Sequence, residues 1–266
     1  MASSRDSDTG ADQAAPMIPR AWLFDFDRTL AILEPEVDWA AGRRALEVEL
    51  ASAGTPPDLL AELIAIHPRG NLVLYEALRA RLFDQDSPLL DEPRARTIIE
   101  RASTLIERYE MAGVDRAAPM AGAADLLARL ARRHIPIAIV TSNSSATVRR
   151  WLEINRLGDI VAEANPEIVA NTGAHTIPTI VGRDAGLAVK PSPATVIRAL
   201  ELLRAGPADA VFIGDSVSDF EAARAASVRF CAIAPELAAS ARLAILGATE
   251  IFSSLDEVSA HFGLSR

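Results

Sequence analysis

The sequence predicts an α/β protein whose core has three layers around a mostly parallel sheet, with a small all-helical domain beside it. Short apolar strands alternate with helices from about Pro119 to Ile233, which is typical of βαβ units with both faces of the sheet covered. Residues 34–115 instead show apolar side chains at helical spacing and no convincing strand. Half of the 266 residues are apolar, enough for a sizeable core. We therefore expect a Rossmann-like core built from 20–33 and 116–266.

Each element follows from its own local pattern. An apolar, aromatic run at 21–26 predicts the first strand, after a polar tail at 1–19 whose acids argue against an export signal. Within the inserted segment, Gly- and Pro-containing breaks at 54–57, 67–70 and 86–88 separate helices. The remaining predictions are a helix around 126–130, a strand at 137–141, a helix at 145–154, strands at 159–162 and 179–182, a helix at 193–203, a strand at 210–214, a helix at 220–226, a strand from 228 and a helix-rich end.

Composition excludes several classes of protein. There are 27 basic and 36 acidic residues, a net charge of −9, and Lys and Arg never occur more than two in a row, so a nucleic-acid partner is not expected. No apolar run approaches the roughly 18 residues of a membrane span. The single cysteine, Cys231, lies in a strand-like run and is interpreted as a packed core thiol. We expect a soluble, cytoplasmic monomer or homodimer.

Acidic side chains follow two of the predicted strands. Asp25 and Asp27 come at the end of the first strand, two residues apart, so that both can point into one space. Asp215 and Asp219 follow the strand at 210–214. One carboxylate of such a set can act as nucleophile or metal ligand and another as acid or base. Carboxylate oxygens also suit Mg²⁺.

Hydrogen-bond donors follow two further segments. Thr141, Ser142 and Asn143 come after the strand at 137–141, and Lys190 is the single lysine in a chain with 26 arginines. Hydroxyl, N–H and ammonium groups neutralise phosphoryl oxygens. Each segment alone also fits an ordinary turn or helix cap. Their occurrence in order, each near a predicted strand end, favours a phosphate-handling site that uses Mg²⁺.

The four segments resemble the motifs of the haloacid dehalogenase (HAD) superfamily, in its phosphatase branch with a helical cap, which includes phosphoglycolate phosphatases and β-phosphoglucomutases. The matching stretches are DFDRTL from Asp25, IVTSN ending at Asn143, KPSP from Lys190, and FIGDSVSD ending at Asp219. The resemblance covers nearly everything from residue 20 onward. It implies that 34–115 is a mobile cap between the first two motifs.

The resemblance also implies a role for each motif residue. Asp25 would attack phosphorus and form an aspartyl phosphate, and Asp27 would protonate the leaving oxygen and then activate water. Lys190 would orient Asp25 and offset charge. The phosphoryl group would be bound by Thr141, Ser142, Asn143 and Lys190. Mg²⁺ would be held by Asp25, the backbone carbonyl of Asp27, and Asp215, with Asp219 as a direct or indirect ligand.

Three features depart from the family pattern or bear on specificity. Arg28 stands where the family commonly has Gly, and it either contacts substrate or turns outward. The helix break containing His67, Arg69 and Asn71 lies where related caps carry a specificity loop, although an ordinary linker explains it equally well. The stretch 159–190 is longer than usual, and residues 165–178 are expected to form an extra loop or hairpin over the site, with His175 interpreted as an exposed loop residue.

The leading function is Mg²⁺-dependent hydrolysis of a small-molecule phosphate monoester. A sugar phosphomutase would use the same core and return the phosphoryl group to its substrate. A non-enzymatic binding protein on this fold is a further alternative. A phosphonate-cleaving relative needs a lysine in its cap, and 34–115 contains none. A dehalogenase lacks the second acid of the first motif, so Asp27 argues against it. The substrate itself does not follow from the sequence.

Overall fold

A six-stranded parallel sheet forms the centre of the computed structural model, which describes residues 17–84, 86, 89–163 and 179–264. Every pair of neighbouring strands is parallel, which confirms the predicted α/β class. Across the sheet the strands are β5 (Thr179–Val181), β4 (Ile137–Val140), β1 (Ala21–Phe24), β6 (Ala210–Gly214), β7 (Arg229–Ile233) and β8 (Ile251–Phe252). The chain extends the sheet to one side of β1 and then to the other, so β1 lies at the topological switch point where such sheets bind ligands.

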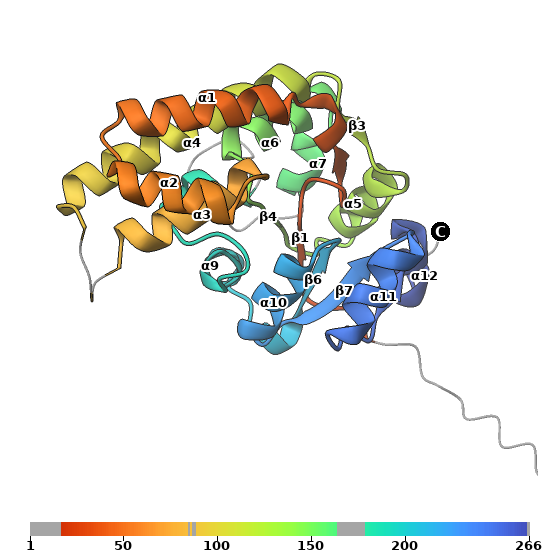
Figure 1. The fold of residues 1–266 in the computed structure, drawn as a ribbon. Coiled ribbons are helices and arrows are strands. Elements are labelled where there is room, and N and C mark those ends of the chain that lie inside the picture. The colour runs from red at the N-terminus through yellow and green to blue at the C-terminus, as the bar shows by residue number, and fades with distance from the viewer. Residues whose placement is uncertain (1–16, 85, 87–88, 164–178, 265–266) are drawn as a thin grey trace, which may run out of the picture.

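Helices cover both faces of this sheet (Figure 1). One face packs against α5 (Ala123–Arg132), α6 (Ser145–Ile154), α7 (Gly158–Glu163) and α12 (Leu255–His261), and the other against α9 (Ala194–Leu203), α10 (Val217–Ala225) and α11 (Leu237–Ile245). Trp22 and Phe24 of β1 join the first cluster, whereas Ala21 and Leu23 join the second. Because both sides of each strand are buried, the strands are continuously apolar.

One predicted strand is wrong. Residues 159–162 lie in the helix α7 rather than in a strand. The run Ile160-Val161-Ala162 is too short for its period to distinguish the two, and here packing against α5 and α6 decides. The predicted long loop around His175 lies outside the described residues, as does the tail before Met17.

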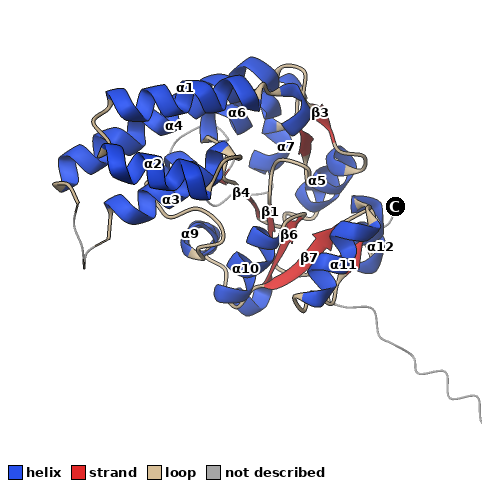
Figure 2. Cartoon of the chain, viewed as in Figure 1, coloured by secondary structure: helices blue, strands red, loops and turns tan. Residues whose placement is uncertain are grey.

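Four helices form a separate apolar cluster beside the core (Figure 2). They are α1 (Trp39–Ser52), α2 (Pro57–Ile66), α3 (Asn71–Leu82) and α4 (Glu92–Val114). The chain leaves the core after β2 (Ala31–Ile32) and returns at β3 (Ala118–Pro119), which pairs with β2 in antiparallel fashion. Both ends of the helical segment therefore meet at one junction. The boundaries 34–115 of a cap domain remain a prediction.

Cys231 is fully buried in the core cluster on the first face of the sheet. Burial raises the pKa of its thiol well above the usual value, so the prediction of a packed thiol is confirmed. None of the helices in the described ranges is long and apolar enough to cross a bilayer.

Candidate active site

The polar segments of the sequence meet at one edge of the sheet. Asp25, Thr141 and Asp215 directly follow β1, β4 and β6, which are neighbours in the sheet. The backbone N–H of Asp25 still donates to Ile213 O at 2.8 Å, so the strand geometry continues into the acidic residue. Since parallel strands end at the same edge, these side chains share one site.

Lys190 lies at the centre of the acidic group. Its ammonium forms ion pairs with Asp25 and with Asp219, the latter at 2.6 Å, and donates to Val140 O at 3.1 Å. All three charged side chains are buried. The structure brings the single lysine of the chain together with Asp25 and Asp219, and the roles of these residues in catalysis remain predictions.

Burial and mutual repulsion control the protonation of this group. Burial raises the pKa of Asp25 well above its usual range, although Lys190 opposes the shift. Burial, followed by repulsion from Asp219, raises the pKa of Asp215 to about 7. Burial alone would lower the pKa of Lys190, but attraction to Asp219 and Asp25 outweighs it and raises that pKa. Lys190 is thus the buried positive charge shared by Asp25 and Asp219, and Arg28 adds a half-exposed one beside Asp215.

The three carboxylates form a set that fits a divalent cation. One oxygen from each of Asp25, Asp215 and Asp219 lies within 4.8 Å of the others. Asp219 Oδ1 is buried and, among the described residues, makes no aligned hydrogen bond despite its ion pair with Lys190. An all-oxygen, strongly negative donor set suits a hard cation such as Mg²⁺. Three of the predicted ligand residues, Asp25, Asp215 and Asp219, therefore form a donor set that fits such a cation.

Asp219 is held by the start of α10. Its Oδ2 accepts from the Ser216 N–H at 3.0 Å and the Ser216 hydroxyl at 2.6 Å, and this capping box begins the helix. A Cβ added at Gly214 would come within 2.7 Å of the Asp219 side chain. Glycine is thus required before Asp215 because a carboxylate packs against its backbone.

Asp27 is not one of the three clustered carboxylates, although its charge contributes to the raised pKa of Asp215. Its Oδ1 accepts from the N–H groups of Leu33 and Glu34 at 2.9 and 3.0 Å. Burial raises the pKa of Asp27 above its ordinary value, although these two hydrogen bonds oppose the shift. Asp27 is thereby tied to the junction where the chain leaves the core for α1–α4.

Arg28 adopts a left-handed backbone, with φ 64°. This conformation explains why glycine suits the position. Its half-exposed guanidinium pairs with Glu34 at 3.1 Å and with Asp215 at 3.2 Å. The Arg28 side chain therefore lies beside the acidic site and is also open to solvent, and its contact with a substrate remains a prediction.

We expect R28G to be more stable than R28A by about 1 kcal/mol, because only glycine relieves the left-handed strain. Both variants lose the same two partly exposed ion pairs, so R28A is the matched control. Urea denaturation measures the difference. Equal stability of the two variants would show that the backbone at this position carries no strain.

Thr141 and Asn143 are joined by reciprocal hydrogen bonds. The Asn143 N–H donates to Thr141 Oγ1, and the Thr141 hydroxyl donates to Asn143 Oδ1, both at 3.0 Å. Asn143 Nδ2 donates to Glu110 Oε1 at 3.0 Å, so this amide is engaged inside the loop. Ser142 directs its carbonyl to Arg183. Contacts of Ser142 and Asn143 with phosphate remain predictions.

Sequence reasoning missed Glu110 and Arg183. Glu110 continues the apolar stripe of α4 through Ala102 and Ile106, and a single acid on such a stripe is an available signal. Arg183, in the short turn η2 (Arg183–Ala185) after β5, is one of 26 arginines, and nothing in its local sequence distinguishes it.

Three of the residues predicted to set specificity, His67, Arg69 and Asn71, lie within the helical segment. Asn71 is buried at the start of α3 and donates to Trp39 O at 3.3 Å, whereas Arg69 is exposed and His67 is half-buried. These contacts do not join the three residues to the carboxylate set. Their role toward a substrate therefore remains a prediction.

Comparison with known proteins places these features in a family. The model of haloacid dehalogenase-like hydrolases matches residues 19–227. Phosphoglycolate phosphatase 1 of Pseudomonas aeruginosa is 27% identical over 220 residues, which cover 82% of this chain and 71% of that protein.

Two solved structures share the fold. A HAD family hydrolase from Deinococcus radiodurans, with bound phosphate and sodium, aligns with a TM-score of 0.54 and 22% identity, over 94% of this chain and 98% of that chain. CbbY from Rhodobacter sphaeroides, in complex with xylulose-(1,5)-bisphosphate, aligns with a TM-score of 0.50 and 24% identity, over 92% and 99%. With its four motifs assembled around one edge of the sheet, the chain belongs to the haloacid dehalogenase-like hydrolase family.

Proposed function

We propose that this HAD-type phosphatase hydrolyses a small-molecule phosphate monoester through an aspartyl phosphate on Asp25, with Mg²⁺ bound. The observation that carries the proposal is the buried ion pair of Lys190 with Asp25, inside a set of three carboxylates at the strand ends. An ammonium in contact with the nucleophile opposes the rise in the pKa of this buried carboxylate and reduces its repulsion from a phosphate dianion.

The reaction divides between the two acids of the first motif. An Asp25 oxygen attacks phosphorus while the bond to the leaving oxygen breaks, and Asp27 gives that oxygen a proton. Asp27 then removes a proton from water, whose oxygen attacks the phosphoaspartate and releases inorganic phosphate with Asp25 restored. Burial favours the protonated form of Asp27 that the first step requires.

The metal would be held by Asp25, the Asp27 backbone carbonyl, and Asp215, with Asp219 as a direct or indirect ligand. Bound Mg²⁺ supplies positive charge that neutralises phosphoryl oxygens. Thr141 would donate its hydroxyl proton to the phosphoryl group while it continues to accept from Asn143 N–H. Rotation of the hydroxyl is sufficient for this exchange.

Relatives and the helical segment support a proposal for the substrate class. The curated relatives are phosphoglycolate phosphatases, and the CbbY structure holds a sugar bisphosphate. We therefore propose a small phosphorylated acid or sugar, enclosed by a cap formed by α1–α4 that excludes water. His67, Arg69, Asn71 and Arg28 are the candidate contacts to the leaving group. A cytoplasmic location and a monomer or homodimer remain predictions.

We expect phosphate release from at least one of a panel of phosphate monoesters, including phosphoglycolate and sugar phosphates, and we expect EDTA to abolish it. Excess Mg²⁺ should restore the rate, because the bound cation again neutralises the three carboxylates and the phosphoryl oxygens of the substrate. Inorganic phosphate is assayed together with the organic product. Formation of an isomeric sugar phosphate without free phosphate would instead identify a phosphomutase, and no reaction by a folded, Mg²⁺-binding protein would favour a binding role.

A further inference from the structure

We propose that Glu110 and Arg183 are positioning residues that fix the side-chain oxygen of Thr141 in place, an inference that rests on the proposed phosphatase function. Their side chains are fully buried and form an ion pair at 2.8 Å between α4 and η2. Neither belongs to the four motifs. Their hydrogen bonds nevertheless converge on the loop that follows β4.

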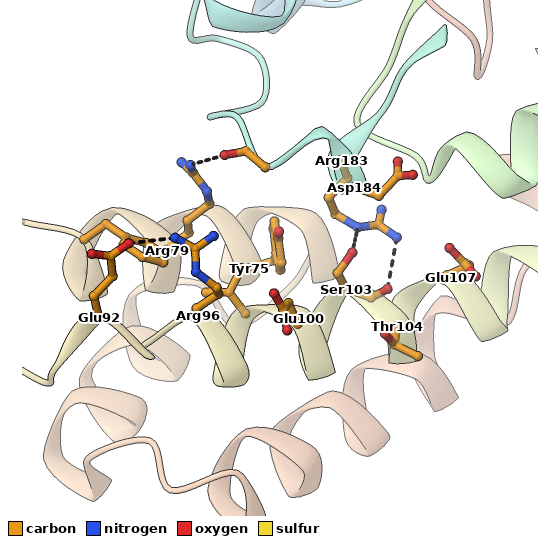
Figure 3. A pocket seen from close by; sticks show the side chains of 13 residues that line it. Tyr75, Arg79, Glu92, Arg96, Glu100, Ser103, Thr104, Glu107, Arg183 and Asp184 are labelled. Atoms are coloured by element: carbon orange, nitrogen blue, oxygen red, sulfur yellow. Dashed lines mark hydrogen bonds and ion pairs between the residues drawn. The ribbon is translucent and has the colours of Figure 1, made fainter. Parts of the chain in front are cut away.

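Arg183 connects this loop to the helical segment. Its Nη1 donates both to Glu110 and, at 2.7 Å, to Ser142 O. Its Nε and Nη2 donate to the hydroxyl and carbonyl of Ser103, at 3.1 and 3.2 Å. Figure 3 shows the guanidinium reaching from the core to α4, at the wall of a cavity of about 420 Å³ between α3, α4 and η2. One side chain thus joins the second motif to α4.

The contact with Ser142 O orients a whole peptide unit. In a trans peptide, the carbonyl and the following N–H point in opposite directions. Holding the Ser142 carbonyl toward Arg183 therefore aims the Asn143 N–H away from it, and that N–H donates to Thr141 Oγ1 at 3.0 Å. Arg183 also donates its own N–H to Asn143 O at 2.9 Å.

Glu110 determines which way the Asn143 amide faces. Because a carboxylate only accepts, the NH₂ end of Asn143 must point to Glu110, at 3.0 Å. The amide oxygen is then turned to Thr141 and accepts its hydroxyl proton. The other oxygen of Glu110 accepts from the Ser144 N–H and the Thr147 hydroxyl, both at 3.1 Å. Arg183 thus holds Glu110, Glu110 orients the Asn143 amide, and that amide holds the Thr141 side chain.

Stability alone is a weak reason for this ion pair. Two buried charges cost free energy to desolvate, and apolar residues of the same volume often do as well. What apolar residues lack is the ability to orient a peptide and an amide. Apart from the Ser103 contacts, the hydrogen-bond partners that the described residues offer to this pair lie in the segment 142–147. The pair therefore preorganises the position of Thr141 Oγ1, whose hydroxyl proton then rotates from Asn143 Oδ1 to the phosphoryl group.

E110Q and R183M test the proposal on the full-length protein with Mg²⁺. We expect kcat for the best substrate of the panel to fall by about 10- to 100-fold in each, with a change in KM below about threefold, because a misplaced hydroxyl weakens transition-state contacts. R183K, which retains the charge, should recover part of the loss. R229M is the matched control, because it breaks another ion pair, with Glu250, at the amino end of β7, and should leave kcat unchanged.

A mutant cycle with T141A separates positioning from general destabilisation. If Glu110 acts through Thr141, E110Q in the T141A background lowers kcat by less than about twofold further. Two results would overturn the proposal while the wild type still turned over substrate. One is that E110Q lowers kcat in the T141A background by as much as it does alone. The other is that E110Q and R183M have the same kcat as R229M. If the wild type releases no phosphate from any substrate, the proposed function fails separately, and calorimetry of inorganic phosphate binding then tests the positioning role. A weaker affinity for phosphate in E110Q than in the wild type supports positioning. An equal affinity, or no binding by the wild type, overturns it.

Discussion

Asn in place of Asp25 is expected to abolish phosphate release, lowering kcat by more than about 10³-fold. An amide cannot attack phosphorus to form the acyl phosphate, and it also loses one of the three carboxylates that suit a cation. The substitution removes a buried acid whose pKa is raised in the fold. Without metal at neutral pH, D25N should therefore be at least as stable as the wild type, since a raised pKa means that ionising the wild-type group opposes folding there.

The measurements are initial rates of phosphate release and thermal unfolding in EDTA. D209N is the matched control, because Asp209 is exposed before β6, at the amino end of the sheet. Quenched wild-type reactions should contain protein heavier by one phosphoryl group, and D25N should not. A folded D25N that turns over at the wild-type rate would end the aspartyl-phosphate scheme.

Met in place of Lys190 is expected to have the second largest effect, on both rate and stability. It removes the ammonium that Asp25 and Asp219 share and leaves buried carboxylates without that partner. Loss of one member of a buried ion pair costs about 3–5 kcal/mol of unfolding free energy. We also expect kcat to fall by about 10³-fold, because the nucleophile loses its orienting contact and its charge balance.

The stability loss of K190M should depend on pH in a defined direction. Without Lys190 the pKa of Asp25 rises further, so the folded variant takes up protons more readily than the unfolded chain. Relative to the wild type, K190M should be least stable in alkaline solution with EDTA and should recover as the pH falls. Added Mg²⁺ should restore part of its melting temperature. If K190M and the wild type melt together in alkaline EDTA, the ion pairs of Lys190 contribute nothing to stability.

The sequence by itself determined the fold class and most of the central site. Continuous apolar strands predicted a sheet covered on both faces, and polar residues immediately after β1, β4 and β6 predicted where a site would form, since parallel strands end at one edge. Asp25, Lys190, Asp215 and Asp219 did come together there. The strand predicted at 159–162 failed because a short apolar run has no distinct period, and contacts with neighbouring helices made it α7.

Only the tertiary structure decided the orientation of the supporting side chains. Asp27 accepts hydrogen bonds at the junction with α1–α4, and Arg28 reaches both Glu34 and Asp215. Glu110 and Arg183 are 73 residues apart in the chain, and their pairing depends on how α4 lies against η2 and α6. Local sequence patterns indicate the backbone conformation and the burial of a segment. The partner of a buried charge depends instead on packing between segments that are distant in the chain. The sequence therefore indicated which groups do chemistry, and the fold alone showed which groups hold them in place.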